Sequence, residues 1–432
     1  MYLRANWATR RSGPRGLLTV AGAAVLVAAC GSTSAPSSSG PSSSARSAAG
    51  SNVVPQVSLT SFTSDINTTM AEFKPLTEYA TKGSNSLQVA VILPDTTSST
   101  RYVDFDQPYL NDAFADAGYT AQQYRIDNAQ GSDATELDDA NADLNLGAKV
   151  LLMDPLDGPT GVAIANLAAA KGATLISYDR ATFQGTDTYY VSFDSYVVGQ
   201  LEGKGFEACV TSWSVPSPKV FVLSGGLDTD PNSVEVAKGY NDVVWSQNQD
   251  TVSAGATNSA GYTLVGENYA PGWDNSKGST IFQQEYTAHP EINAVITAND
   301  GLANVVINDL KADGVGPNKV PTVGQDATAQ GMAWILEGYQ CGSVYKAIYV
   351  EAQDAVALAT ILLAGDKPPA GLVNTTTTDP ANSAITEPAS LLTPIWVTTT
   401  NMESTVVKDG FDTASSICAI AGATVCSASS IS

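Results

Sequence analysis

The chain has 432 residues, 43% of them hydrophobic, and carries 43 acidic against 21 basic side chains, a formal net charge of −22 at pH 7. This length and composition are enough for two globular domains, and such acidity argues against nucleic acid as a partner. The chain has one histidine, His289, which argues against a histidine-rich metal site and against a serine–histidine–aspartate triad. We therefore expect no metal, no cofactor and no catalytic residues.

The first 29 residues have the parts of an export signal. Arginines precede a small apolar core, Leu17 to Ala29, and Cys30 follows Val27-Ala28-Ala29 directly. This order is similar to the lipobox of bacterial lipoproteins, in which the cysteine becomes the lipidated first residue. We expect residues 1–29 to be a signal peptide, Cys30 to carry lipid, and residues 30–51, rich in Ser, Gly, Ala and Pro, to be a tether. No later segment has about 18 uninterrupted apolar residues, so only the anchor is expected to enter the outer face of the cell membrane.

The segment from 87 to 194 alternates short apolar runs with amphipathic runs, which is typical of βαβ units and parallel sheets. Asp133 with Glu136 is expected to cap one helix, which Gly147 then ends. A further helix is expected near 70–81, started or kinked by Pro75. The expected strands are 87–93, 119–126, 149–155, 173–178 and 189–194, and the expected helices are about 105–118, 133–146 and 162–171.

The same alternation restarts after residue 194, so we place a domain change there. The predicted fold class is α/β, with two doubly wound parallel-sheet domains. The expected helices are 196–209, 233–246, 277–288, 302–312 and 348–363. The expected strands are 219–224, 263–269, 292–298, 320–324, 343–346 and 391–397.

The strand 173–178 ends abruptly in a carboxylate and a guanidinium, Asp179 and Arg180. In an open parallel sheet, this end of a strand faces the ligand crevice. A sugar hydroxyl both donates and accepts hydrogen bonds, so a carboxylate that only accepts beside a guanidinium that only donates suits a polyhydroxy ligand. An ordinary ion pair at a strand end would have the same sequence.

Other polar and aromatic residues follow strands in the second half. Asn299, Asp326 and Lys346 stand at strand ends, while Asn232 and Trp273 follow strands through short loops. Each has an ordinary alternative: Asn299 could cap a helix, Trp273 could belong to the core, and Lys346 could be a solvated charge. Together they indicate several recognition groups converging on one crevice.

Taken in order, these segments resemble the xylose-binding members of the type 1 periplasmic binding proteins, the receptors of sugar ABC importers. The resemblance covers residues 87 to 411. The segments are Pro94-Asp95 through Arg101-Tyr102, Ser177-Tyr-Asp-Arg180, Tyr190-Val-Ser-Phe-Asp194, Pro231-Asn232, Pro271-Gly-Trp273, Thr297-Ala-Asn-Asp300, Gly324-Gln-Asp326, Val344-Tyr-Lys346, Leu391-Leu-Thr-Pro394 and Val407-Lys-Asp-Gly-Phe411.

The resemblance implies a set of ligand-binding residues. Two positions depart from its pattern, since Tyr102 and Tyr269 stand where tryptophan is frequent, and this bears on the identity of the sugar. Trp273 is expected to stack on the sugar ring. The implied set is Arg101, Tyr102, Asp179 and Arg180 from the first domain, Asn232, Trp273, Asn299 and Asp326 from the second, and Lys346 from the hinge.

The family fold also implies three crossings between the domains, near 192–194, at 346–347 and near 392–394. The first lobe is then 52–192 plus 347–392, and the second is 193–346 plus 393–432. Four cysteines beyond Cys30, in a chain bound for an oxidising compartment, favour two disulfides. All four fall in the second lobe under these crossings. The expected pairs are Cys209 with Cys341 and Cys418 with Cys426.

We therefore expect a non-enzymatic, monomeric lipoprotein that binds an aldopyranose, D-xylose first and glucose-like sugars second, and delivers it to an ABC transporter permease. Closure of the two lobes around the ligand is the expected signal. The alternatives are another monosaccharide or a nucleoside in the same fold, and a lipoprotein glycosidase that uses two carboxylates. A sugar-responsive repressor is disfavoured by the export signal and by the lack of a DNA-binding helix pair.

Overall fold

The computed structural model describes residues 54–57, 70–96, 101–183, 188–226, 230–380 and 382–431. All of them belong to one of the two units into which the chain divides, Val53–Ser432. The predicted signal peptide, Cys30 and the tether lie outside the described residues. Among the helices described, none has the length and apolar character needed to cross a membrane.

A seven-stranded sheet is the centre of the first lobe. Its neighbouring strands are parallel except for the antiparallel pair β11–β12. The order across the sheet is β11 (Thr375–Thr378), β12 (Thr386–Leu392), β5 (Thr188–Phe193), β4 (Thr174–Tyr178), β3 (Val150–Met153), β1 (Val89–Leu93) and β2 (Tyr124–Asn128).

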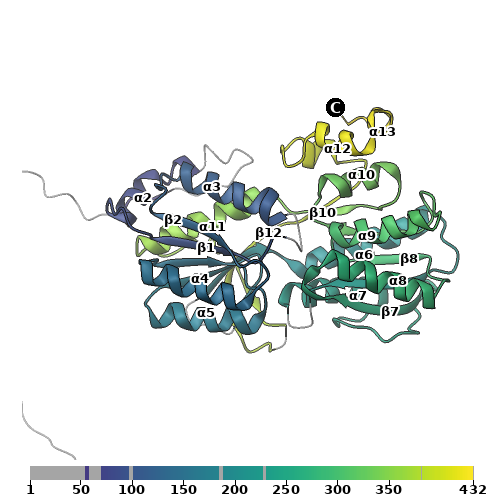
Figure 1. Cartoon of the computed structure of the whole chain (residues 1–432), viewed down its shortest axis with the longest axis horizontal. Helices are drawn as coiled ribbons and strands as arrows, with labels where there is room; N and C mark the ends of the chain where they lie inside the picture. The colour runs from purple at the N-terminus through teal and green to yellow at the C-terminus, as the bar shows by residue number, and fades with distance from the viewer. Residues whose placement is uncertain are drawn as a thin grey trace, which may run out of the picture. The chain divides into compact units, whose positions relative to one another are not determined.

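Helices cover both faces of this sheet because both faces are apolar. Successive side chains of a strand point to opposite faces, so Val89 and Val91 of β1 pack with one set of helices while Ala90 and Ile92 pack with the other. The first set is α2 (Lys74–Thr81), α3 (Gln107–Asp116) and α11 (Ile348–Leu363), and the second is α4 (Asp133–Leu146) and α5 (Gly158–Ala170) (Figure 1).

The second lobe contains two three-stranded sheets. One has the order β7 (Thr263–Ala270), β6 (Lys219–Gly225), β8 (Ala294–Thr297), and the other has the order β13 (Ile395–Val397), β10 (Ser343–Tyr345), β9 (Gly324–Gln325). The core splits again by strand alternation, since Val220 and Val222 of β6 pack on one side and Phe221 and Leu223 on the other. The helices are α6 (Ser195–Ser212), α7 (Pro231–Trp245), α8 (Asn275–Ala288), α9 (Asp300–Ala312) and α10 (Ala329–Glu337).

Helices α6 and α7 touch backbone to backbone at two glycines. A Cβ on Gly199 would lie 2.0 Å from the Val236 carbonyl oxygen, and one on Gly239 would lie 2.2 Å from the Tyr196 oxygen. Only glycine permits this approach. The start of α7, which carries Asn232, is thereby held close to the start of α6.

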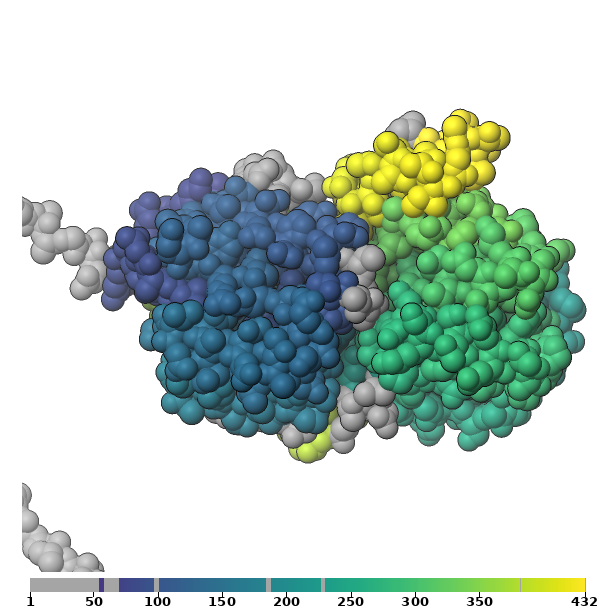
Figure 2. All heavy atoms as spheres, viewed as in Figure 1, coloured from purple at the N-terminus to yellow at the C-terminus, as the bar shows by residue number. Residues whose placement is uncertain are grey.

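The chain leaves the seven-stranded sheet after β5, returns between β10 and α11, which packs on that sheet, and leaves it again between β12 and β13. After η3 (Glu403–Val407), two short helices, α12 (Ala414–Ala421) and α13 (Ala423–Ala428), end the described chain. Ile417 and Ala421 of α12 pack with Met332 and Ala333 of α10, and Figure 2 shows this C-terminal segment in yellow over the green surface.

The structure differs from the sequence-based expectations in the C-terminal part. The single strand expected over 391–397 is wrong, because β12 ends at Leu392 in one sheet and β13 begins at Ile395 in another. Pro394 lies between them and has no N–H for a ladder, so the strand breaks there. Helices α10, α12 and α13 and strand β11 were not predicted.

The predicted cap of α4 is also wrong. The N-cap is Ser132, whose hydroxyl accepts from the Thr135 amide, whereas the Glu136 carboxylate turns inward and accepts from the Leu156 amide at 3.2 Å. Burial raises the pKa of Glu136 to about 8. Gly147 ends the helix in the left-handed conformation, as predicted.

Both expected disulfides are present, Cys209–Cys341 and Cys418–Cys426, each with a Cα–Cα distance of 5.8 Å. The first joins the last part of α6 to the segment before β10, and the second links α12 to α13. The predicted pairing is confirmed.

Candidate functional site

The residues predicted to bind ligand lie around one small cavity in the Val53–Ser432 unit. The space open to the centre of a water molecule is about 40 Å³. At ~10–15 Å³ for each water, this is room for about three waters. The predicted residues that line it are Arg101, Tyr102, Asp179, Arg180, Asn232, Trp273, Asn299, Asp326 and Lys346.

Strand ends bring most of these side chains together. Asp179 directly follows β4, Asp326 follows β9, and Lys346 follows β10. Parallel strands place their carboxyl ends at one edge of a sheet, where ligands of open α/β sheets bind. Arg101 and Tyr102 come instead from the start of the π-helical turn η1 (Tyr102–Asp106), in the first lobe.

Asp179 is the most heavily bonded carboxylate of the site. Its Oδ1 accepts from Arg101 Nη1 at 2.7 Å and its Oδ2 accepts from the Tyr102 hydroxyl at 3.1 Å. Burial alone would raise the pKa of Asp179, but the charges of Arg101, Lys346 and Arg180 outweigh it and lower the pKa to about 2. Asp179 is therefore a carboxylate at neutral pH.

Arg101 is buried among three carboxylates of the first lobe. Besides Asp179, its guanidinium donates to Asp106 through Nε and Nη2, at 2.9 and 2.8 Å, and to Glu351 through Nη2 at 2.9 Å. Burial raises the pKa of Glu351 to about 8, although Arg101 opposes the shift. Arg101 thus ties η1 to α11 and to the end of β4.

Arg180 has fewer close partners. Its Nη1 donates to the Pro155 carbonyl at 3.2 Å and its Nη2 to the Tyr102 hydroxyl at 3.0 Å. The carboxylates of Asp154 and Asp230 each lie 3.6 Å away, within ion-pair range but too far for direct hydrogen bonds. Burial raises the pKa of Asp154.

The second lobe and the junction provide a further charge pair and an amide. Lys346 Nζ lies 2.9 Å from Asp326 Oδ1, and both residues are buried. Asn299 caps α9, its Oδ1 accepting from the Leu302 amide at 2.8 Å. The capping role foreseen for Asn299 is therefore real, and its side chain still borders the cavity.

Asn232 joins the two lobes beside the cavity. Its Nδ2 donates to the Asp179 carbonyl at 2.8 Å, and its Oδ1 accepts from the Tyr190 hydroxyl at 3.1 Å. The same hydroxyl also donates toward the Asp179 carbonyl, at 2.8 Å. The side chain of Asn232 is thus largely occupied by contacts across the lobes.

Three cavity residues other than glycine have a left-handed backbone, with φ of 61° at Asp179, 55° at Trp273 and 92° at Asp326. This region is unfavourable for side chains other than those of Gly, Asn and Asp, and it is found where the surroundings hold a functional group in place. Trp273 pays the largest steric penalty of the three, because its side chain is the bulkiest.

Part of the lining, and nearly all of the residues that hold the lining side chains in place, were not predicted from the sequence. The remaining lining residues are Ser192, Phe193, Ser195, Val198, Val236 and Gln325. Several lie within segments already singled out, so their position next to a strand end was a usable signal. Tyr269, in contrast, does not line the cavity, and its hydroxyl lies 3.4 Å from the Asp250 carbonyl.

Among the described residues, no group of three or more His, Cys, Asp or Glu side chains could hold a metal ion.

Residues 89–367 match the family described as periplasmic binding protein domain. The chain belongs to this family. This periplasmic binding protein is 30% identical over 287 residues to the D-xylose-binding periplasmic protein of Escherichia coli, a match that covers 66% of this chain and 80% of the relative. It is 28% identical to a multiple sugar-binding periplasmic receptor of Rhizobium radiobacter, over 75% of this chain and 90% of the relative.

A solved structure of a carbohydrate transporter solute-binding protein from Chloroflexus aurantiacus, in complex with D-glucose, matches with a TM-score of 0.64 and 25% identity. That match covers 77% of this chain and 98% of the other. The fold is therefore the type 1 periplasmic binding protein fold, as the resemblance implied. The relatives are periplasmic binding components of transport and not enzymes, so the glycosidase alternative is set aside.

Proposed function

We propose that this chain is the extracytoplasmic sugar-binding component of an ABC importer and that its ligand is an aldopyranose resembling D-xylose. The observation that carries the proposal is the convergence of the nine predicted side chains on one cavity. The names of the E. coli and Rhizobium relatives and the glucose complex of the Chloroflexus protein support the same ligand class.

The chemistry of the lining suits a sugar. Cationic donors, carboxylate acceptors and the amide of Asn299 all line the cavity, and each ring hydroxyl can pair with either kind of group. Trp273 supplies an apolar surface for the C–H face of a pyranose.

Lobe closure is the proposed signal to the transporter. The contacts of Asn232 with Asp179 and Tyr190 already bridge the lobes beside the cavity. A ligand that touches both lobes stabilises the closed state only through contacts made there and not in the open state. We place the boundaries of the lobes at 52–192 plus 347–392 and at 193–346 plus 393–432.

The membrane attachment is also a proposal. The sequence before the described residues supports cleavage before Cys30 and lipidation of that cysteine, with residues 31–51 as a tether. Stable anchoring needs about two acyl chains, which one diacylated cysteine provides. Mass spectrometry of the N-terminal peptide checks this, and an unmodified Cys30 or cleavage elsewhere would refute it.

Calorimetry against a panel of monosaccharides and nucleosides tests the ligand. Binding of D-xylose first and of glucose-like sugars second is expected, at an affinity near micromolar, or about 8 kcal/mol. Tight binding of a nucleoside alone would replace the sugar with the other ligand class. If no compound produces heat, the proposed function is wrong.

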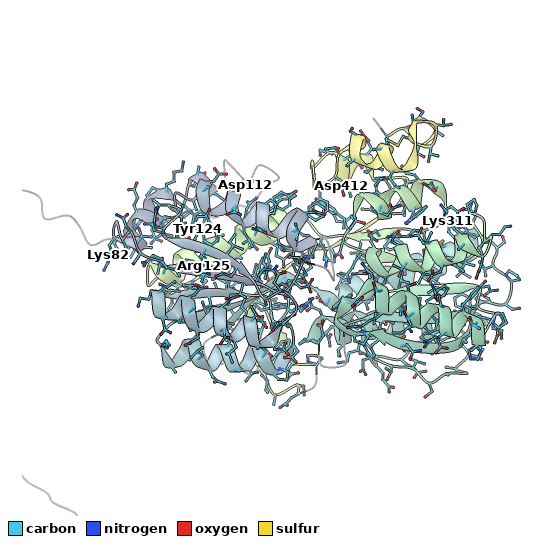
Figure 3. All side chains as sticks on the ribbon, viewed as in Figure 1. Lys82, Asp112, Tyr124, Arg125, Lys311 and Asp412 are labelled. Atoms are coloured by element: carbon cyan, nitrogen blue, oxygen red, sulfur yellow. A yellow bond between two sulfur atoms is a disulfide. The ribbon has the colours of Figure 1, made fainter. Side chains whose placement is uncertain are left out.

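A matched pair of tryptophan variants separates binding from folding. Trp273 and Trp334 are both buried, but Trp334 does not line the cavity. The ring centroid of Trp334 lies 4.0 Å from Nζ of Lys311, which is labelled in Figure 3. Trp273→Ala and Trp334→Ala should both lower the melting temperature, whereas only Trp273→Ala should weaken sugar binding, by at least about tenfold. An unchanged affinity in folded Trp273→Ala protein contradicts the stacking role.

A further inference from the structure

Asp230 stands immediately before α7 and is 4% exposed, yet it does not line the cavity. Its two carboxylate oxygens have different partners. Oδ1 accepts from the backbone amides of Asn232 and Ser233, at 2.9 and 3.3 Å, and so caps α7. Oδ2 accepts from the indole Nε1 of Trp273 at 2.7 Å and lies 3.6 Å from Nε of Arg180.

We propose that Asp230 is a positioning residue for ligand binding, which sets the indole of Trp273 in one lobe and faces the guanidinium of Arg180 in the other. The inference rests on the proposed function, since both partners are proposed to touch the sugar. Asp230 acts through them, because it does not border the cavity itself.

The seat of the Trp273 ring explains why one hydrogen bond can fix it. A Cβ on Gly225 would lie 2.0 Å from ring carbons Cε3 and Cζ3, and a Cβ on Gly226 would lie 2.8 Å from Nε1. The ring therefore rests on bare backbone at the end of β6. The backbone contact and the bond to Asp230 together restrict the side-chain torsions of Trp273.

Arg180 gives Asp230 a second role. The guanidinium comes from the first lobe, whereas Asp230 belongs to the second, and their 3.6 Å separation makes an ion pair across the cleft. A charge at this distance orients the guanidinium without occupying its N–H groups in a direct hydrogen bond. The Asp230 carboxylate thus contacts both the Trp273 ring and, on the opposite lobe, the Arg180 guanidinium.

Asp230→Asn in the full chain tests the proposal, because asparagine caps a helix about as well as aspartate but removes the charge. The matched control is Asp274→Asn, since Asp274 caps α8 through the Ser276 and Lys277 amides and does not line the cavity. We expect Asp274→Asn to melt close to the unmodified chain and Asp230→Asn to melt lower, because the Trp273 N–H loses its acceptor, so binding is compared at a temperature at which both variants are folded. Calorimetry with the sugar that the unmodified chain binds should give an affinity at least about tenfold weaker for Asp230→Asn and unchanged for Asp274→Asn.

Trp273→Phe provides a second variant, which keeps a ring but removes the N–H that Asp230 accepts. If Asp230 acts through Trp273, the double variant should lose less affinity than the product of the two single losses. If the affinity loss of the double variant equals the product of the two single losses, the role assigned to this hydrogen bond is wrong. It is also wrong if the Trp273→Phe chain binds sugar as tightly as the unmodified one.

The outcomes separate the two proposals. A chain that binds sugar and does so equally well after Asp230→Asn leaves the proposed function standing and removes the inference. An unmodified chain that binds no sugar of the panel removes both.

Discussion

The two buried arginines of the site are expected to respond differently to the same substitution. A guanidinium has five N–H groups. In Arg180, the hydrogen bonds to described residues use two of them, to the Pro155 carbonyl and the Tyr102 hydroxyl. The remaining N–H groups of Arg180 can donate to ligand hydroxyls. Arg180→Gln should therefore weaken sugar binding more than it lowers stability.

The magnitude follows from the number of bonds lost. A hydrogen bond to a charged group contributes about 1.5–3 kcal/mol, and about 1.4 kcal/mol is a factor of ten in affinity. Loss of one such bond predicts roughly tenfold to a hundredfold weaker binding, and loss of two predicts more. The stability loss is limited because burial raises the pKa of Asp154, which favours a neutral carboxyl there once the guanidinium is gone.

Arg101→Gln is the matched comparison. Arg101 donates to three buried carboxylates, those of Asp106, Asp179 and Glu351. Removing the cation takes the direct partner from the carboxylates of Asp106 and Asp179, while Glu351, whose pKa burial raises to about 8, is neutral at pH 7. Loss of one partner of a buried ion pair destabilises a protein by about 3–5 kcal/mol. The expected result is a large fall in melting temperature or little folded protein.

Calorimetric titration and thermal melting of both variants decide the matter. An Arg180→Gln chain that binds sugar as tightly as the unmodified one would show that the Arg180 guanidinium does not donate to the ligand. An Arg101→Gln chain that melts like the unmodified one would contradict the structural part of the prediction, because loss of the cation would then not destabilise the buried carboxyl groups around it.

Two further predictions concern stability. Replacing the Cys209–Cys341 pair with serines should destabilise the chain more than replacing Cys418–Cys426, because the sequence separations are 132 and 8; the chain-entropy account gives roughly 5 and roughly 2.5 kcal/mol, and equal losses in denaturant melts would contradict it. Burial raises the pKa of Asp354 to about 7 from an ordinary 3.8, so the folded chain keeps a proton that the unfolded chain loses, and stability should fall as pH rises between these values. Asp354→Asn should flatten that part of a plot of melting temperature against pH, and an unchanged slope would count against the assignment.

Local sequence was sufficient where an element depends on its own pattern. The strand β1 and the left-handed glycine after α4 could both be predicted, because a short bounded apolar run and a helix stop are local properties of the sequence. The C-terminal helices α12 and α13 could not be predicted. They are short and depend on packing against α10 and on the Cys418–Cys426 disulfide. Short helices of this kind form through tertiary contacts and not through their own propensity.

The same distinction explains the site. Residues that follow strands could be predicted, because the ends of parallel strands share an edge. Their supports could not, since Glu351 is 250 residues away from Arg101 and the carboxylate of Asp230 meets Trp273 only after folding. In the sequence, Asp230 can be recognised only as an ordinary helix cap, and nothing there indicates what its second carboxylate oxygen contacts.

The charged side chains around the cavity pair with one another, and this bears on the kind of sugar that can bind. Arg101, Arg180 and Lys346 each lie within 4 Å of at least one carboxylate of the second or first lobe. A ligand carboxylate would have to compete with those partners and would face the negative charge of Asp179. A neutral hydroxyl instead accepts from a cation and donates to its carboxylate without separating the pair. D-glucose should therefore bind at least about tenfold more tightly than D-glucuronate in calorimetric titrations at neutral pH. Equal or tighter binding of the acid would mean that one of these cations is left unmatched when the lobes close.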